Sequence, residues 1–90
     1  MSSRIVITNS QTIPVTVGVE PWGRDFTLLP DEEFSFQAVS PGDDFHFHAY
    51  WGTRDISLYA NGDCEDVEVY QGDRELECGH NRHHRADREL

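Results

Sequence analysis

The chain has no lysine, and its seven basic residues are all arginine. A Schiff-base lysine, a lysine general base and the lysine of a Walker-type phosphate loop are therefore excluded. The sequence also has no glycine-rich phosphate loop and no Gly-x-Ser-x-Gly nucleophile motif. From these absences we expect a protein that is not an enzyme.

Long hydrophobic runs are missing as well. No apolar stretch approaches the roughly 20 residues that cross a bilayer. The segment Met1-Ser2-Ser3-Arg4 lacks the apolar core of a secretory signal peptide. We therefore expect no membrane association and a cytoplasmic location.

Positive charge is scarce, because 17 acidic residues oppose seven arginines and give a formal charge of -10 over 90 residues. Such a polyanion is not expected to bind nucleic acid directly. The charge does favour one alternative, an acidic decoy that occupies a basic, nucleic-acid-binding partner. The densest acidic run lies within residues 63–77, where we expect charge to protect a strand edge. Its members are Asp63, Glu65, Asp66, Glu68, Asp73, Glu75 and Glu77.

Apolar residues recur with a period of two along most of the chain, which is typical of half-buried β-strands. We expect about seven short strands, separated by turn residues, and no helix. The pattern predicts an all-β protein: a single small antiparallel β-sandwich over residues 1–78, immunoglobulin-like or cupredoxin-like, or a partly open barrel. The expected strands cover residues 4–8, 13–20, 26–28, 34–38, 44–51, 56–60 and 67–71.

Two further segments carry distinct local signals. Asn61-Gly62-Asp63 predicts a hairpin that joins the strands on either side of it. Residues 79–90 are rich in histidine and arginine and have only Ala86 and Leu90 as aliphatic residues. We expect a disordered, flexible tail there. We expect this tail to fold against the acidic residues 63–77, and to do so more strongly below a pH of about 6.5, when its histidines are protonated.

The segment Glu20-Pro21-Trp22-Gly23, followed by Leu28-Leu29-Pro30-Asp31-Glu32, resembles a group of small uncharacterised bacterial β-sandwich proteins. These carry a Glu-Pro-Trp-Gly segment and a following Leu-x-Pro-x-Glu turn. The resemblance covers residues 13–77, although Asp31 stands where the group has glycine. It implies a small β-sandwich and no particular activity. Trp22 has two interpretations, a plug at one end of the sandwich or part of an interaction surface.

The run from Asp44 to Trp51 is the most regular strand pattern. Its apolar residues are expected to point inward, and its polar residues outward. The outward pair His46 and His48 has the spacing to bind zinc or copper, or simply forms a polar outer face. Together with Tyr50 and Tyr59 this pair predicts an exposed face for a protein partner or for a homodimer formed through a strand edge. The expected inward residues are Phe45, Phe47, Ala49 and Trp51.

Cys64 and Cys78 are the only cysteines. A disulfide between them would close a loop of about 15 residues, whereas a cytoplasmic location favours two free thiols. Cys78 also begins a cluster with tail histidines that suits zinc, nickel or copper. The Cys78-x4-His83 spacing resembles the ligand loop of blue copper proteins, but Arg88 stands where their axial ligand is expected. The cluster consists of Cys78, His80, His83 and His84.

The sequence thus predicts a non-enzymatic β-sandwich that serves as a protein-interaction or structural module. No cofactor is expected under this hypothesis. The alternatives are a metal-binding protein that uses zinc, copper or nickel, and the acidic decoy.

Overall fold

Within residues 3–84 the chain forms eight strands, most of them with alternating apolar residues, and one short 3-10 turn. The structure is a computed structural model that describes residues 3–84. The prediction of an all-β fold is confirmed. In chain order the elements are β1 (Arg4–Thr8), β2 (Val15–Glu20), β3 (Arg24–Leu28), β4 (Glu33–Val39), β5 (His46–Trp51), β6 (Asp55–Asn61), β7 (Asp66–Gln71), β8 (Arg74–Glu75) and the 3-10 turn η1 (Arg82–His84).

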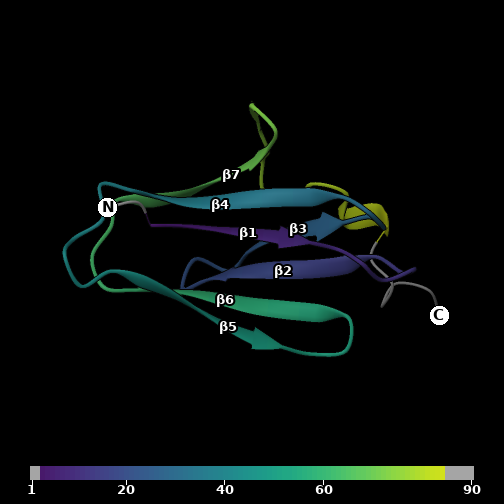
Figure 1. Cartoon of the computed structure of the whole chain (residues 1–90), viewed down its shortest axis with the longest axis horizontal. Coiled ribbons are helices and arrows are strands. Elements are labelled where there is room, and N and C mark those ends of the chain that lie inside the picture. Colours follow the sequence, from purple (N-terminus) through teal and green to yellow (C-terminus); the bar gives the residue numbers. More distant parts are fainter. Residues whose placement is uncertain (1–2, 85–90) are drawn as a thin grey trace.

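The strands form a two-layered sandwich (Figure 1). Sheet A has the order β1-β4-β7-β8, and sheet B has the order β3-β2-β6-β5. Every neighbouring pair is antiparallel except β2 and β6, which run parallel from Thr16 opposite Asp55 to Glu20 opposite Tyr59. The expectation of an antiparallel sandwich is therefore wrong for this one pair. The chain leaves sheet B to form β4 and then returns, and such a crossover allows two strands to meet in the same direction.

The core lies between the two sheets and follows the period-two pattern. Val17 and Val19 from β2 are fully buried, as are Phe34 and Phe36 from β4. The Phe26 and Phe36 rings meet edge to face with centroids 6.2 Å apart. Because side chains alternate along a strand, the residues between these positions face outward and remain available for a functional surface.

The predicted hairpin at Asn61-Gly62-Asp63 is not formed. Instead this segment carries the chain from β6 in sheet B to β7 in sheet A. β7 pairs with β4 rather than with β6, because its buried Val67 and Val69 complete the inner face of sheet A. The Gly42 N–H donates to the Asp63 carbonyl at 2.8 Å, so the β6–β7 crossover lies beside the β4–β5 crossover.

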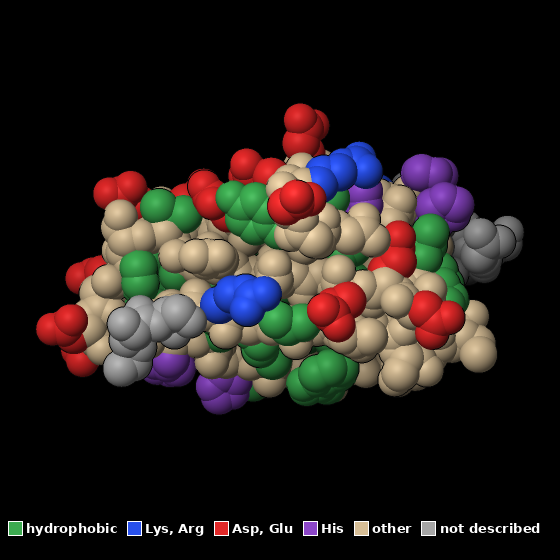
Figure 2. Space-filling view, turned by 45° about the horizontal axis from the view of Figure 1, so that its top comes forward, with side chains coloured by type: hydrophobic (Ala, Val, Ile, Leu, Met, Phe, Trp, Pro, Cys, Tyr) green, Lys and Arg blue, Asp and Glu red, His purple; other side chains and the backbone are tan. Residues whose placement is uncertain are grey.

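Acidic residues gather at the end of the molecule that holds both crossovers. Asp43 and Asp44 come from one crossover, and Asp63 and Glu65 come from the other. Figure 2 shows acidic side chains clustered at this left-hand end. Part of the acidic run 63–77 thus lies at this end of the molecule, whereas Glu68, Asp73, Glu75 and Glu77 lie on or beside β7 and β8, at the edge of sheet A where charge was expected.

The tail predicted to begin at residue 79 is ordered as far as residue 84. The Thr27 N–H donates to the His80 carbonyl at 2.9 Å, and Asn81 Nδ2 donates to the Thr27 carbonyl at 3.1 Å. An isolated parallel bridge joins Phe26 to His80. These contacts form because β3 is an edge strand whose outer backbone groups would otherwise lack partners. Residues 79–84 therefore cover β3 rather than residues 63–77. The rest of the predicted tail, residues 85–90, lies outside the described residues, and the expected strengthening of the contact at low pH stays a prediction.

Trp51 differs from its expected inward place, and the position of Trp22 excludes one of its two interpretations, while its role in an interaction surface stays a prediction. Trp51 is 68% exposed although it lies opposite the buried Ile56, because β5 is an edge strand of sheet B. Trp22 lies in the β2–β3 turn and is 41% exposed, so it does not plug the sandwich. The Arg24 guanidinium instead lies 5.1 Å from the Trp22 ring centroid. Within residues 3–84 there is no helix of the length and apolar character that a membrane span requires.

Candidate functional site

The outer face of sheet B carries the residues that the core does not use. On β2, Thr16, Gly18 and Glu20 alternate with buried valines and so face outward. The parallel register places these residues level with Asp55, Ser57 and Tyr59 of β6, respectively. The antiparallel register of β5 extends two of these cross-strand pairs, because Tyr50 lies opposite Ser57 and His48 lies opposite Tyr59. A row of outward side chains therefore crosses β2, β6 and β5.

Three aromatic side chains on this face touch one another, and we call them the aromatic row: His48, Tyr50 and Tyr59. The His48 and Tyr50 rings stack with centroids 4.6 Å apart and an interplanar angle of 22°. The Tyr50 and Tyr59 rings meet edge to face at 5.5 Å. Tyr50 is 59% exposed and Tyr59 is 40% exposed. The expectation that these residues share an exposed face is confirmed.

A hollow lies beside the aromatic row, over β2 and β6. Its floor is low because Gly18 has no side chain and Thr16 and Ser57 have small ones. The hollow has a volume of about 510 Å³. A second hollow of about 380 Å³ shares Ser57 and reaches Tyr50, Tyr59 and Asn61. The two together connect the aromatic row to the middle of sheet B, and we call this surface the sheet B hollow.

Charged groups stand around the sheet B hollow, and some already have partners. Arg24 Nη2 donates to Asp66 Oδ1 at 2.6 Å and to the Val67 carbonyl at 3.3 Å, which ties β3 to β7 across the sandwich. Asp25 forms an ion pair with Arg82 from the C-terminal segment. These two pairs close the β3 side of the hollow.

Three other charged groups of the hollow have no such contacts. No hydrogen bond or ion pair within the described part of the chain engages the side chains of Glu20, Asp55 or Arg54. Glu20 is half-buried, whereas Asp55 and Arg54 are exposed. Two carboxylates and one guanidinium therefore remain to interact with a ligand, and their sum is negative.

The predicted metal ligands are distributed over two separate places. His46 and His48 are exposed on β5, where His46 Nδ1 lies 3.3 Å from the Asp44 carbonyl oxygen. At the other place, the His83 and His84 rings lie 4.0 Å apart in η1. The His80 ring turns inward, with its centroid 5.6 Å from that of Phe34.

Among residues 3–84, no three His, Cys, Asp or Glu side chains converge in a way that would hold a metal ion. Binding of zinc, copper or nickel by these residues stays a prediction.

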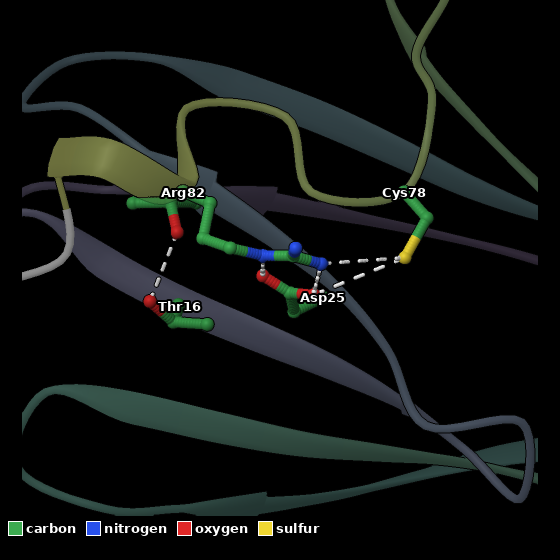
Figure 3. A network of polar contacts seen from close by, with 5 residues as sticks. Thr16, Asp25, Cys78 and Arg82 are labelled. Carbon is green, nitrogen blue, oxygen red and sulfur yellow. Dashed lines mark hydrogen bonds and ion pairs between the residues drawn. The ribbon is translucent and has the colours of Figure 1, made fainter.

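Cys64 and Cys78 are both free thiols, so the possible disulfide is not formed. The register of β7 and β8 pairs Tyr70 with Glu75, and the Leu76 N–H donates to the Val69 carbonyl. Continued along the chain, this register brings Cys78 to the level of Val67, three residues away from Cys64. Cys78 Sγ instead lies 3.8 Å from both Asp25 Oδ1 and Arg82 Nη2 (Figure 3).

Partial burial raises the pKa of the Cys64 thiol, and the charges of Asp66 and Asp63 raise it further.

Sequence reasoning identified the aromatic row but missed the sheet B hollow. The one available signal was Gly18, a glycine at an outward position within an otherwise regular strand, which often marks close approach by another group. Glu20 and Asp55 gave no signal, because only the parallel pairing of β2 with β6 brings these two residues onto one surface.

Comparison with known proteins identifies no relative: no protein-family model, no curated protein and no solved structure matches this chain. The resemblance carried by Glu20-Pro21-Trp22-Gly23 therefore stays a prediction.

Proposed function

We propose that this chain is a non-enzymatic protein-interaction module that binds an extended, arginine-containing segment of a partner protein on the outer face of sheet B. The observation that carries the proposal is the aromatic row beside the unpaired carboxylates of Glu20 and Asp55. Tyrosine rings and carboxylates are the two kinds of group that attract a guanidinium, the first through the ring face and the second through charge-assisted hydrogen bonds.

Net charge supports a basic partner. The chain carries a formal charge of -10, which accelerates encounter with a positively charged surface and disfavours an acidic one. Of the two arginines within residues 3–84 that line the hollow, Arg54 is the unpaired one, and a partner carboxylate or carbonyl would satisfy it. A basic, nucleic-acid-binding protein is one partner of this type, so the acidic-decoy hypothesis is a special case of the proposal.

The shape of the site supports an extended segment rather than a globular ligand. The sheet B hollow is open and shallow, and its floor runs across the strands from Gly18 to Ser57. Backbone approach is possible there because Gly18 presents no side chain. Arginine side chains of the segment would then reach the aromatic row on one side and Glu20 on the other.

The test uses a short synthetic peptide of alternating arginine and serine, titrated into the isotope-labelled chain and followed by NMR. We expect the largest amide shifts at Gly18, Ser57 and Tyr59, and we expect affinity to fall as salt is raised. A double variant, Glu20→Gln with Asp55→Asn, should weaken binding about tenfold because it removes both unpaired carboxylates.

The matched control removes the same number of charges from the acidic end of the molecule, with Asp43→Asn and Asp44→Asn. This variant should bind the peptide nearly as well as the parent chain. If both double variants lose the same affinity, or if the shifts centre on residues 42–44 and 61–66, the binding is unspecific charge attraction and the proposed function is wrong. Tyr50→Ala separately tests the aromatic contribution, and unchanged affinity in that variant contradicts it.

A further inference from the structure

Sheet B ends in β3 on one side and in β5 on the other, and within residues 3–84 no segment pairs with the outer side of β5. Figure 1 shows β5 at the lower rim of the sandwich. Proteins usually protect such an edge with proline, charged side chains or a bulge. β5 has none of these devices, since its sequence is His-Phe-His-Ala-Tyr-Trp and its pairing with β6 is continuous. The strand is thus ready to pair with another strand.

The hydrogen bonds of β5 show which backbone groups face the open side. The Gly52 N–H donates to the Asp55 carbonyl at 2.7 Å and closes the turn between β5 and β6. In an antiparallel ladder, residues that exchange both bonds with a neighbour alternate with residues that face away from it. The backbone N–H and carbonyl groups that bond to β6 are therefore those of His46, His48 and Tyr50. The N–H and carbonyl groups of Phe47, Ala49 and Trp51 point to the open edge.

We propose that a second copy of this chain occupies the edge, with its β5 antiparallel to the first and with a twofold axis at Ala49. This register places Ala49 opposite Ala49 of the second copy, and Phe47 opposite Trp51 of the second copy. Each of the outward-facing N–H and carbonyl groups then has a partner, whereas a shift by two residues leaves some of them unpaired. The two copies of sheet B form one continuous sheet. The inference does not rest on the proposed function, although Arg54 and the aromatic row take part in both.

Side chains in this register complement one another on both faces. On the inner face, the half-buried Phe47 meets Trp51 of the second copy, which is 68% exposed in the single chain. On the outer face, His48 meets Tyr50 of the second copy, so the two aromatic rows become continuous. Aromatic pairs of this kind are favourable across antiparallel strands.

Charge selects the same register. Asp44 precedes β5 and Arg54 follows it, and the twofold axis at Ala49 places Asp44 of one copy level with Arg54 of the other. Both residues are exposed in the single chain, and no ion pair within the described residues engages either. The acidic ends of the two copies then lie at opposite ends of the dimer, which limits the repulsion between two strongly acidic chains.

The remaining edges are less suitable. Residues 79–84 cover β3, and β8 has only two residues. β1, the free edge of sheet A, is a shorter strand. If two copies of β1 were to pair about Val6, Arg4 would meet Thr8 rather than an acidic residue.

The first test is light scattering and sedimentation of the untagged chain at about 10 to 500 µM, since dimer population depends on protomer concentration. We expect a dimer at the upper concentrations. Ala49→Pro should remain monomeric there and still fold, because it removes an N–H that faces the open edge and none that bonds to β6. Amide protection of β6 verifies that the variant is folded. A strictly monomeric parent chain, or a folded Ala49→Pro variant that dimerises normally, overturns the proposal.

The second test is a charge-reversal cycle, which reads the register itself. Asp44→Arg and Arg54→Asp should each weaken dimerisation about tenfold, because each places like charges opposite one another twice per dimer. The double variant should recover most of that loss. If it dimerises no better than the single variants, the register centred on Ala49 is wrong. The proposed function is tested separately by the peptide titration, in which Ala49→Pro leaves Glu20, Asp55 and Gly18 intact.

Discussion

Arg82 and Asp25 form a two-point ion pair: Arg82 Nε lies 3.0 Å from Asp25 Oδ2, and Arg82 Nη2 lies 2.5 Å from Asp25 Oδ1 (Figure 3). Paired hydrogen bonds between a guanidinium and a carboxylate have defined geometry as well as charge. The hydrogen bonds and the charge of Asp25 raise the pKa of Arg82 further above its already high value. The pair anchors the C-terminal segment to β3, next to the Thr27 N–H that donates to His80.

Arg82→Ala should therefore release residues 79–84 from β3. The Thr27 N–H would lose its partner part of the time, and its hydrogen exchange should become faster, whereas exchange at Val17 should not change. Arg74→Ala is the matched control, because Arg74 is exposed and makes no ion pair within residues 3–84. Exchange of Thr27 that is equally slow in both variants would show that the backbone bonds hold the segment without the ion pair.

The strands and most of the core are predictable from the sequence because their information is local. Alternation assigns Val17, Val19, Phe34 and Phe36 to an inner face without knowledge of the partner strands. The aromatic row is predictable for the same reason, since His48 and Tyr50 alternate with apolar residues on one strand.

Sheet assignment is not local, and the failed predictions share that cause. Asn61-Gly62-Asp63 has the composition of a hairpin, but whether it turns within a sheet or crosses between sheets depends on which strand takes β7. Residues 79–84 are ordered because they pair with the open edge of β3, and their own polar sequence does not reveal that edge. The sheet B hollow needs the parallel pairing of β2 and β6, for which neither strand carries a signature.

The two cysteines should react with a thiol reagent at different rates. Cys78 is exposed, whereas partial burial and nearby aspartates raise the pKa of the Cys64 thiol above its ordinary value of 9.0. Because the thiolate is the reactive form, Cys64 should react about tenfold more slowly at a pH near 8. Stopped-flow measurements with Ellman's reagent should show two phases. Cys78→Ser should remove the fast phase, and Cys64→Ser should remove the slow phase. A single phase in the parent chain, with both thiols reacting at the same rate, would contradict the placement of Cys64.

Tyr70 should ionise at higher pH than an ordinary tyrosine. Its hydroxyl donates to Glu68 Oε1 at 2.7 Å, and this bond, with burial and the charge of Glu68, raises the pKa of Tyr70 from the usual 10.0. The native state favours the protonated phenol, so the bond's contribution to stability is fully present below pH 10 and is lost as pH rises through the raised pKa. Glu68→Gln should lower the pKa of Tyr70, as followed by the carbon chemical shift of its ring. An unchanged pKa in that variant would mean that Glu68 is not the cause.

Two turn glycines with positive φ should differ in their tolerance of alanine. Gly72 has a φ of 63°, and a Cβ there would meet nothing within 4 Å, so Gly72→Ala carries only backbone strain. That strain should lower the free energy of unfolding by about 1–2 kcal/mol. Gly62 has a φ of 96°, and a Cβ there would lie 2.9 Å from the Cα of Phe45. Since Phe45 leads into β5, Gly62→Ala must shift the backbone at the acidic crossovers and should cost about 2–4 kcal/mol in all. Urea denaturation of the two variants compares these losses directly. Equal losses would indicate that the β4–β5 and β6–β7 crossovers are not packed against each other at Phe45 and Gly62.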